Sequence, residues 1–323
     1  MQISVIIPTY NRENTLFITL ESLLKANFPK DNYEIIVCDN NSTDNTKKRV
    51  LEFISDHKEY SIHYLPELRQ GVHYARNTAA KFSKGEYLYF TDDDMIADEN
   101  LFSELLWLYT LDPLLASATG VVLPKWEVTP PDWVLQLYTN GYLSLSNPDG
   151  DDVDISDDYS KIFSCHQMIK RDVFFKSGGY NPENTKGEWI GDGETGLNIK
   201  IKELGYKFGF NRKSITHHII PPARLTQNYF NRRFYNQGNC DSYTYYRANQ
   251  PNDFKLLVGT IFKSCYVVKE FLNILRYKMF GNVQWRVSYP RCYYWLARIK
   301  YDWRLYSNES WRNLVLKNNW LEE

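Results

Sequence analysis

The sequence has few of the features that mark disulfide-linked, zinc-binding or membrane-spanning proteins. Its five cysteines are scattered and form no C-x-x-C pair: Cys38, Cys165, Cys240, Cys265 and Cys292. Neither a zinc site nor a disulfide framework is therefore indicated, and a reducing compartment is the simpler expectation. No stretch approaches the roughly 20 consecutive apolar residues that a membrane-spanning helix requires.

The first residues also lack the basic region and the apolar length of a signal peptide, because the run at 3–7 stops at Pro8. We therefore expect a cytoplasmic protein, with peripheral attachment to the inner face of the membrane as the alternative.

Two common nucleotide-binding signatures are missing as well. No G-x-G-x-x-G follows the first predicted strand, and G-x-x-x-x-G-K-[ST] occurs nowhere. Both absences argue against a dinucleotide oxidoreductase and a P-loop NTPase. The net charge of −1 gives no reason to expect a nucleic-acid partner. Aromatic residues, in contrast, are abundant, with 25 Tyr and 9 Trp. They suit a carbohydrate site or a membrane interface as well as an ordinary core.

The first 110 residues alternate strand-like and helix-like segments. Strands are predicted at 3–7, 33–38, 61–65 and 86–91, and helices at 13–26, 45–55, 71–83 and 98–110. This alternation predicts β-α-β units and a right-handed, mostly parallel sheet flanked by helices. Polar or acidic residues follow several of the strands, at the edge where open α/β sheets bind nucleotides.

Three consecutive carboxylates, Asp92, Asp93 and Asp94, follow the strand at 86–91. Adjacent anions repel one another, and Mg²⁺ or Mn²⁺ would remove that cost through hard oxygen ligands. Such a cation is best used to neutralise a diphosphate. The alternative is a solvated acidic turn that caps the helix at 98–110.

The pattern is looser beyond residue 110. A strand is predicted at 116–123, and the irregular segment at 124–158 is typical of a binding loop or lid. A helix at 194–204 and strands at 207–210 and 214–218 follow. From residue 253 the chain is predicted to be helical and amphipathic. These helices would pack on the main domain or on a second copy, or lie on an anionic membrane surface.

A second acidic cluster precedes the helix at 194–204. Asp192 and Glu194 would either cap this helix or supply a general base that deprotonates an attacking hydroxyl. His217 and His218 end a predicted strand, where neighbouring side chains point to opposite faces, so that one could reach a metal while the other packs. Arg76 could bear on phosphate, or form an i,i+4 pair at the surface.

Together these residues resemble the family 2 glycosyltransferases, which are inverting nucleotide-sugar enzymes of the GT-A fold. The matching motifs are S-V-I-I-P-T-Y-N-R from Ser4, I-I-V-C-D-N-N-S-T-D from Ile35, G-x-x-x-A-R-N from Gly71, G-E-Y-L-Y-F-T-D-D-D from Gly85, G-G-Y-N from Gly178, the G-E-T-G-L segment from Gly193 to Tyr206, and the pair at 217–218. Each motif is short, but their order and spacing over residues 1–220 are specific. The segment 221–323 matches less distinctively.

The resemblance implies how a nucleotide-sugar donor would bind. The donor-binding residues would be Pro8, Thr9, Tyr10, Arg12, Asp39, Arg76, Asp92 and Asp93, with Thr9 and Asp39 at the nucleoside. The D-x-D pair falls on Asp92 and Asp94, with Asp92 nearer the ribose, and a shift by one residue would bring in Asp93. Asp94 would bind Mn²⁺ or Mg²⁺ together with His218, for which His217 is the alternative. A UDP-sugar is the expected donor, and dTDP- and GDP-sugars are the alternatives.

The resemblance also implies the catalytic and acceptor-side residues. The acidic pair of the family, usually Glu-Asp, falls here on Gly193 and Glu194, so Glu194 would be the base and Asp192 its alternative. Three tryptophans would stand on the acceptor side, or else belong to the core: Trp126, Trp133 and Trp189.

The expected architecture is therefore a GT-A domain at 1–222, with a nucleotide-binding half at 1–110 and an acceptor-side half at 111–222, followed by a helical region at 223–323. The expected function is inverting, metal-dependent transfer of a sugar to a hydroxyl of a saccharide or lipid-linked acceptor, in bacterial surface polysaccharide or glycoconjugate synthesis. One rival is a phosphotransferase with an Asp nucleophile, which would place its acidic pair on the first strand. The other is a nucleotide-sugar binding protein of the same fold that has lost the base.

Overall fold

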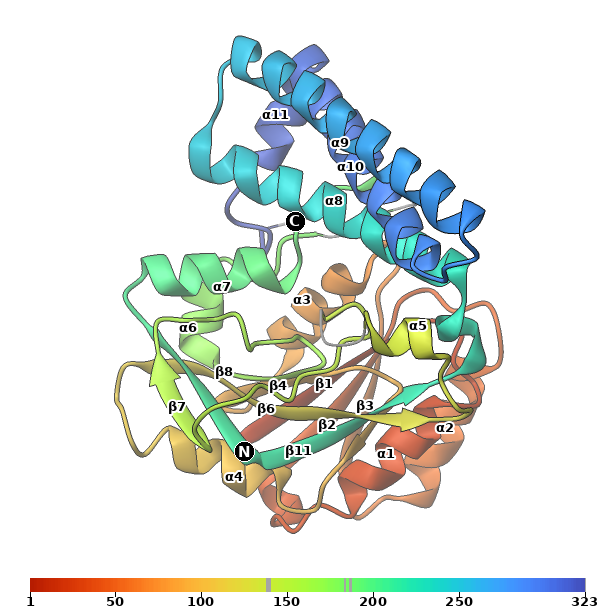
Figure 1. Ribbon diagram of the computed structural model, residues 1–323. Coiled ribbons are helices and arrows are strands. Elements are labelled where there is room, and N and C mark those ends of the chain that lie inside the picture. Colours follow the sequence, from red (N-terminus) through yellow and green to blue (C-terminus); the bar gives the residue numbers. More distant parts are fainter. Residues whose placement is uncertain (138–140, 183, 186–187, 323) are drawn as a thin grey trace.

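A mixed β-sheet with helices on both faces forms the larger part of the molecule (Figure 1). The computed structural model describes residues 1–137, 141–182, 184–185 and 188–322. The first elements are β1 (Ile3–Thr9), α1 (Leu16–Leu24), η1 (Lys30–Asn32), β2 (Tyr33–Asp39), α2 (Thr46–Asp56), β3 (Ser61–Pro66), α3 (Val72–Phe82), β4 (Tyr87–Thr91), β5 (Met95–Ala97), α4 (Leu101–Leu108), β6 (Leu115–Trp126) and α5 (Asp132–Leu135). Those that follow are β7 (Val153–Ser156), β8 (His166–Lys170), α6 (Arg171–Lys176), β9 (Asn184–Thr185), β10 (Glu188–Trp189), α7 (Glu194–Glu203), β11 (Lys207–Ile220), η3 (Pro222–Leu225), α8 (Gln227–Asn249), α9 (Asp253–Met279), α10 (Trp285–Ser307) and α11 (Glu309–Val315).

The large sheet has the strand order β3-β2-β1-β4-β8-β6-β11-β5, and β7 pairs with β11. Strands β1 to β4 are parallel to their neighbours within this group, as the alternation of strands and helices predicts. Beyond β4 the sheet becomes mixed, because β8 runs antiparallel to both β4 and β6. Strands β5 and β7 likewise run antiparallel to β11.

Two apolar layers hold the helices against the sheet. One layer contains Leu20 of α1 and Leu105 of α4, packed below the sheet in Figure 1 together with the inward side chains of β1 and β2. The other contains Ala79 of α3, Phe174 of α6 and Leu197 of α7, above the sheet. Strand residues alternate between the two layers, because successive side chains of a strand point to opposite faces.

The second half of the chain differs from its prediction in several elements. The segments at 207–210 and 214–218 belong to one long strand, β11, whose register shifts between Asn211 and Ile215. The segment at 124–158 is not wholly irregular, since it includes the end of β6, the short helix α5 and strand β7. Strands β5 and β8 and helix α6 were not predicted.

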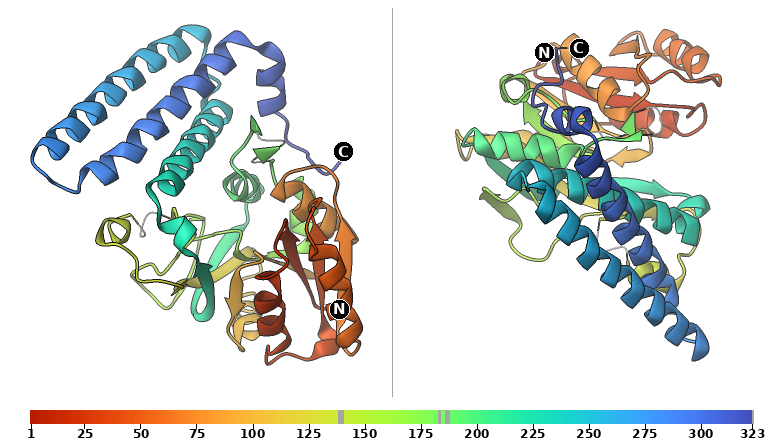
Figure 2. Two further views of the ribbon diagram at one scale, coloured as in Figure 1. Left: turned by 90° about the vertical axis from the view of Figure 1, so that its right-hand side faces the viewer. Right: turned by 90° about the horizontal axis from the view of Figure 1, so that it is seen from above.

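Helices α8, α9 and α10 form a separate layer at one side of the α/β part. Helix α8 lies nearest the sheet, α10 packs against α8, and α9 packs against α10 (Figures 1 and 2). The pair of α9 and α10 extends well beyond the α/β part (Figure 2). Across the part of the chain that the structure describes, none of the helices combines the length and the apolar character that a bilayer crossing demands.

Gly85, just before β4, sits where any larger residue would strain the fold. A Cβ at this position would lie 2.4 Å from the backbone nitrogen of Ser4. Gly259 in α9 is its matched control, because there the nearest atom to an added Cβ is Nζ of Lys263, the end of a long side chain, at 3.2 Å and not backbone. We expect Gly85→Ala to lower the free energy of unfolding by about 2 kcal/mol through overpacking, and Gly259→Ala to raise it by about 0.5–1 kcal/mol through helix propensity.

Chemical denaturation of both variants measures these changes. Equal stabilities of Gly85→Ala and the unsubstituted protein would show that β1 and β4 do not approach as closely as described.

Candidate functional site

The carboxyl ends of β1 and β4 meet because the two strands are adjacent and parallel. Thr9, at the end of β1, donates a hydrogen bond from Oγ1 to Oδ2 of Asp93 at 2.7 Å. Arg12 approaches the other oxygen of Asp93, with Nε at 3.4 Å from Oδ1. Burial and the adjacent charge of Asp94 raise the pKa of Asp93, although Arg12 and Thr9 act in the opposite direction.

The other two aspartates are each held by an arginine from a different part of the chain. Arg76, from α3, donates from a terminal nitrogen to Oδ1 of Asp92 at 2.5 Å. Arg224, from η3, donates to Oδ2 of Asp94 at 2.5 Å. Burial by itself raises the pKa of Asp94, but His218, Arg224 and Arg12 lower it well below its usual range. The acidic cluster is therefore ionised at Asp94 and compensated by nearby guanidinium groups.

Asp94 and His218 form the pair that best fits a divalent cation. His218 donates from Nδ1 to the carbonyl of Leu143 at 2.8 Å, so Nε2 is the nitrogen that carries the lone pair when the ring is neutral. That Nε2 lies 3.4 Å from Oδ1 of Asp94, which is buried and has no hydrogen-bond partner. Nε2 also accepts a hydrogen bond from Arg224. A backbone carbonyl behind a histidine is the usual arrangement for fixing the metal-binding tautomer.

These two side chains would be only part of a cation site. Within the described ranges, no group of three or more His, Cys, Asp or Glu side chains is arranged to hold a metal. Mg²⁺ and Mn²⁺ are often held by one or two protein carboxylates, with substrate phosphate and water completing the shell. The residues present fit a cation that is shared with a phosphate-bearing ligand.

Glu194 is connected to the aspartate cluster through a chain of hydrogen bonds. It is the first residue of α7, and its Oε2 accepts a hydrogen bond from Oγ of Ser164 at 2.6 Å. Ser164 in turn accepts a hydrogen bond from Arg76 at 2.9 Å. Arg76 also donates to Asp92, so this one arginine connects Asp92 to Glu194 through Ser164.

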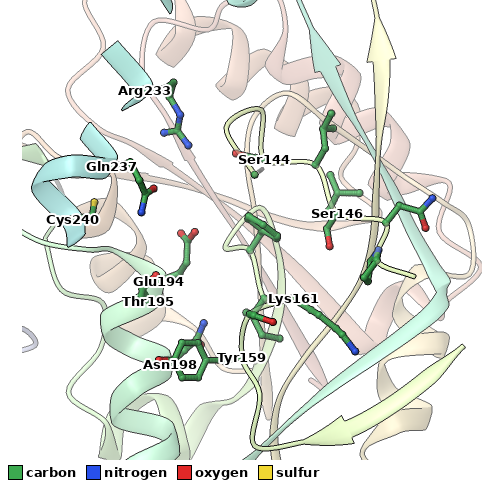
Figure 3. A pocket seen from close by; sticks show the side chains of 18 of the residues that line it. Ser144, Ser146, Tyr159, Lys161, Glu194, Thr195, Asn198, Arg233, Gln237 and Cys240 are labelled. Atoms are coloured by element: carbon green, nitrogen blue, oxygen red, sulfur yellow. The ribbon is translucent and has the colours of Figure 1, made fainter. Parts of the chain in front are cut away.

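Two cavities, of about 740 and 870 Å³, adjoin at Glu194. The smaller cavity is lined by Pro8, Thr9, Tyr10, Arg12, Arg76, Asp92, Asp93, Asp94, Glu194 and His218. We call it the aspartate cleft. The larger one, the second cavity, is lined by Glu194, by Trp126 and Trp189 and by residues of α8 (Figure 3). In Figure 3, Arg233 of α8 and Glu194 of α7 are both directed into the second cavity. Both cavities lie in the size range typical of small-ligand sites.

Two of the predicted donor-binding and metal residues, Asp39 and His217, lie away from the aspartate cleft. Asp39 is buried and accepts hydrogen bonds from the Tyr64 hydroxyl at 2.8 Å and the backbone N–H of Ser42 at 2.9 Å. Its neighbour Asn40 lines the cleft, whereas Asp39 does not. His217 lines neither cavity, as expected for the neighbour of His218 in a strand.

Asp192 has the environment of a structural carboxyl. It accepts hydrogen bonds from Thr244 of α8 at 2.6 Å and from Asn181 at 3.4 Å. Burial raises its pKa to about 6, against the effect of these hydrogen bonds. Asp192 touches the second cavity but, unlike Glu194, not the aspartate cleft.

Trp133, the third of the acceptor-side candidates, belongs to the core. It is 9% exposed and packs edge-on against Phe230, with the Arg286 guanidinium over its ring. It lines neither cavity, so the alternative interpretation of this residue holds.

Arg224, Ser164 and Arg233 are the site residues that the sequence did not reveal. Arg224 follows His218 closely in the sequence, and this proximity is the one feature from which its place in the site could have been predicted. Ser164 lies just before β8, and Arg233 lies in α8. Neither element carries a recognisable motif, so only the folded arrangement brings these side chains to Glu194.

Curated relatives match a part of the chain. A glucosyltransferase of Escherichia coli, named UDP-Glc:alpha-D-GlcNAc-diphosphoundecaprenol beta-1,3-glucosyltransferase, is 38% identical over 94 residues. These cover 29% of this chain and 35% of that protein. The poly(ribitol-phosphate) beta-N-acetylglucosaminyltransferase of Staphylococcus aureus is 36% identical over 124 residues, which cover 38% of this chain and 22% of that protein. The match thus spans about a third or less of each relative's length.

Solved structures of glycosyltransferases share the fold at low sequence identity. A mannosyltransferase from Pyrobaculum calidifontis, in complex with GDP-Man and Mn²⁺, has a TM-score of 0.63 at 17% identity. The similarity covers 95% of this chain and 88% of that one. GalNAc-T7 with UDP, GalNAc and Mn²⁺ has a TM-score of 0.53 at 19% identity, covering 72% of this chain and 47% of that one. The predicted GT-A fold is confirmed.

The family profile gives the most direct assignment. The profile of "Glycosyl transferase family 2" matches residues 4–175, which are more than half of the 323 residues. The predicted resemblance is therefore confirmed, and the chain belongs to glycosyl transferase family 2.

Proposed function

We propose that this chain is an inverting glycosyltransferase that moves a sugar from a nucleoside-diphosphate sugar to an acceptor hydroxyl. The observation that carries the proposal is the place of Glu194 at the junction of the aspartate cleft and the second cavity. A donor in the cleft and an acceptor in the second cavity would meet at this carboxylate. A general base must be within hydrogen-bond reach of the proton that it removes.

The proposed reaction is a single displacement. Glu194 accepts the proton of the acceptor hydroxyl as the oxygen attacks the anomeric carbon. The bond between that carbon and the diphosphate oxygen breaks, and the nucleoside diphosphate departs with the bonding electron pair. Because attack and departure occur on opposite faces, the configuration at the anomeric carbon inverts. Ser164 and Arg76 keep the carboxylate of Glu194 in place.

Asp94 and His218 would hold Mn²⁺ or Mg²⁺, which would neutralise charge on the departing diphosphate. Arg12 and Arg224 stand beside the same aspartate and add positive charge to the aspartate cleft. Fixed positive groups aimed at developing negative charge are a major source of rate enhancement in water-poor sites. The GDP-Man and Mn²⁺ in the P. calidifontis structure support a nucleotide-sugar donor and this use of a cation.

The second cavity suits a saccharide acceptor that carries phosphate. Trp126 and Trp189 offer rings for sugar faces, and polar side chains line the rest of the wall. Arg233 donates from Nε to the carbonyl of Tyr142 at 3.2 Å. The described residues place no carboxylate in an ion pair with Arg233, in contrast to Arg76 and Arg224. The names of the E. coli and S. aureus relatives both specify phosphate-bearing acceptors. We therefore propose a lipid-linked or polymeric acceptor of bacterial surface glycoconjugates.

The catalytic role of Glu194 is tested with Glu194→Gln. We expect kcat for sugar transfer to fall by at least about 100-fold, because the amide cannot accept the proton. Donor binding should stay unchanged. The measurement is release of nucleoside diphosphate from a panel of UDP-, dTDP- and GDP-sugars, combined with thermal stabilisation by each donor.

Glu203→Gln, at the other end of α7, is the matched control and should retain full turnover. If Asp192→Asn abolished turnover while Glu194→Gln retained it, Asp192 would be the base. Donor binding without turnover in the unsubstituted protein, over a broad acceptor panel, would favour a nucleotide-sugar binding protein.

The cation site is tested by thermal stabilisation with UDP and Mn²⁺. A ligand that binds only the folded state raises the melting temperature, so the shift reports the joint binding of nucleotide and metal. We expect a chelator, Asp94→Asn and His218→Ala each to remove most of the shift, and His217→Ala to retain it. A shift that the chelator leaves unaltered would exclude a cation from the site, and the arginines alone would then bind the diphosphate.

A further inference from the structure

The outer face of α9 exposes a continuous stripe of apolar side chains. The stripe consists of Ile261, Cys265, Val268, Leu272, Leu275 and Met279, spaced alternately four and three residues apart. This spacing places all of them on one face of a helix. Ile261 is 65% exposed, Leu272 58% and Met279 75%. We refer to these six residues as the outer stripe.

The outer stripe lies opposite the face of α9 that packs on α10. That inner face is marked by Leu256, Glu270 and Ile274, the buried residues of α9. Further exposed apolar residues, Phe254, Phe262, Phe271 and Phe280, extend the apolar surface along the helix and past its end. So large a contiguous apolar surface is unusual on a soluble protein and marks an interaction surface.

The charge of this region is opposite to that of the rest of the chain. Residues 253–307 contain ten Lys or Arg and three Asp or Glu, a net charge of +7. Two of the three acidic residues, Glu270 and Asp302, are buried. The remaining residues of the chain contain 28 basic and 36 acidic side chains, a net charge of −8. The apolar surface therefore sits on a strongly basic part of the molecule.

A second copy of the same helix is a poor partner for the outer stripe. In a two-helix pair along this seam, the flanking positions would hold Phe262, Lys269 and Arg276 on one side and Ser264, Phe271 and Lys278 on the other. None of these residues is acidic, so the pair would gain no complementary ion pairs along its flanks. An anionic lipid surface, in contrast, attracts lysine and arginine and accepts the apolar face.

We propose that α9 lies on an anionic membrane surface, with the outer stripe in contact with the acyl boundary. Phe262 and Phe271 would add aromatic area there, while Lys269, Arg276 and Lys278 would reach lipid phosphates at the flanks. Binding would be peripheral, through one face of the helix. This inference goes beyond the proposed transferase activity and depends on the surface of α9 alone.

The position of α9 would bring the second cavity close to the membrane. The turn after α9 contacts the α5 segment, where Nε2 of Gln284 donates to Oε1 of Gln136 at 2.8 Å. Leu135, next to Gln136, is 42% exposed and lines the second cavity. The exposed Val283 directly precedes Gln284 and so lies at the turn that contacts this segment. A lipid-anchored acceptor would reach the cavity from that side.

The test is flotation of the full chain with vesicles. One set contains phosphatidylcholine alone, and the other contains equal parts of phosphatidylcholine and phosphatidylglycerol. We expect flotation with the anionic vesicles, little with the neutral ones, and a decrease as salt is raised. Leu272→Gln combined with Leu275→Gln should lower the partition coefficient at least about tenfold. Lys269→Glu combined with Arg276→Glu should do the same for anionic vesicles only.

The matched control is Leu51→Gln combined with Leu111→Gln. Both residues are 47% exposed, but they lie on the acidic α/β part, so this double variant should float like the unsubstituted protein. Equal losses for the control and the α9 variants would overturn the proposal. So would a dimer, detected by sedimentation without lipid, that Leu272→Gln and Leu275→Gln dissociate, because the outer stripe would then bind a second copy.

Cys265 allows membrane contact to be measured on the unsubstituted protein, so the result does not depend on whether a variant folds. It lies in the outer stripe and is exposed, whereas Cys38, Cys165, Cys240 and Cys292 are buried. A polarity-sensitive thiol dye on Cys265 should shift its emission to shorter wavelength when anionic vesicles are added. An unshifted spectrum at saturating vesicle concentration would contradict the proposal, whatever the variants do. None of these measurements depends on enzymatic turnover. A negative result would therefore contradict the membrane proposal and leave the proposed transferase activity untouched.

Discussion

The compensation of charge at the end of β4 is the constraint on which the rest of the site depends. Asp93 and Asp94 are almost fully buried, and burying an ionised carboxylate without a partner is costly. The fold meets this cost with Arg12 after β1 and Arg224 after β11, while Arg76 from α3 pairs with the neighbouring Asp92. The aspartates thus require that three distant parts of the chain come together. The geometry of the aspartate cleft and the stability of this edge of the sheet have a common origin.

The sequence predicted the part of the fold in which local pattern and tertiary role agree. The strands near residues 3–9 and 33–39 are mostly apolar and fully buried, because both of their faces are covered by helices. Strand β8 escaped prediction because two of its four buried residues, His166 and Gln167, are polar. His166 binds the Tyr89 hydroxyl at 2.9 Å, and Gln167 donates to Ser117 at 3.0 Å. Prediction from the hydrophobic periodicity of the sequence treats polar residues such as these as exposed. Only the structure shows the hydrogen-bond partners that allow them to be buried.

The candidate site shows the same division. The positions of Asp94, His218 and Glu194 could be anticipated, because short motifs at strand and helix ends carry them. What could not be anticipated is how they are connected, through Ser164 and through Arg224. Separations of 30 and 130 residues in the chain become hydrogen bonds in the fold. Such contacts follow from topology, and no local pattern in the sequence encodes them.

Helix α8 connects the candidate site to the helical layer. One of its sides lines the second cavity and the other packs against α10. Arg233 and Cys240 contribute to the wall of the second cavity. Gly238 allows α10 to pack closely, since a Cβ there would lie 2.3 Å from the carbonyl oxygen of Tyr294. Any force that orients α10 and its partner α9 therefore acts on the helix that forms part of the cavity wall. On this arrangement, a lipid surface bound by α9 would also fix the orientation in which an acceptor meets Glu194.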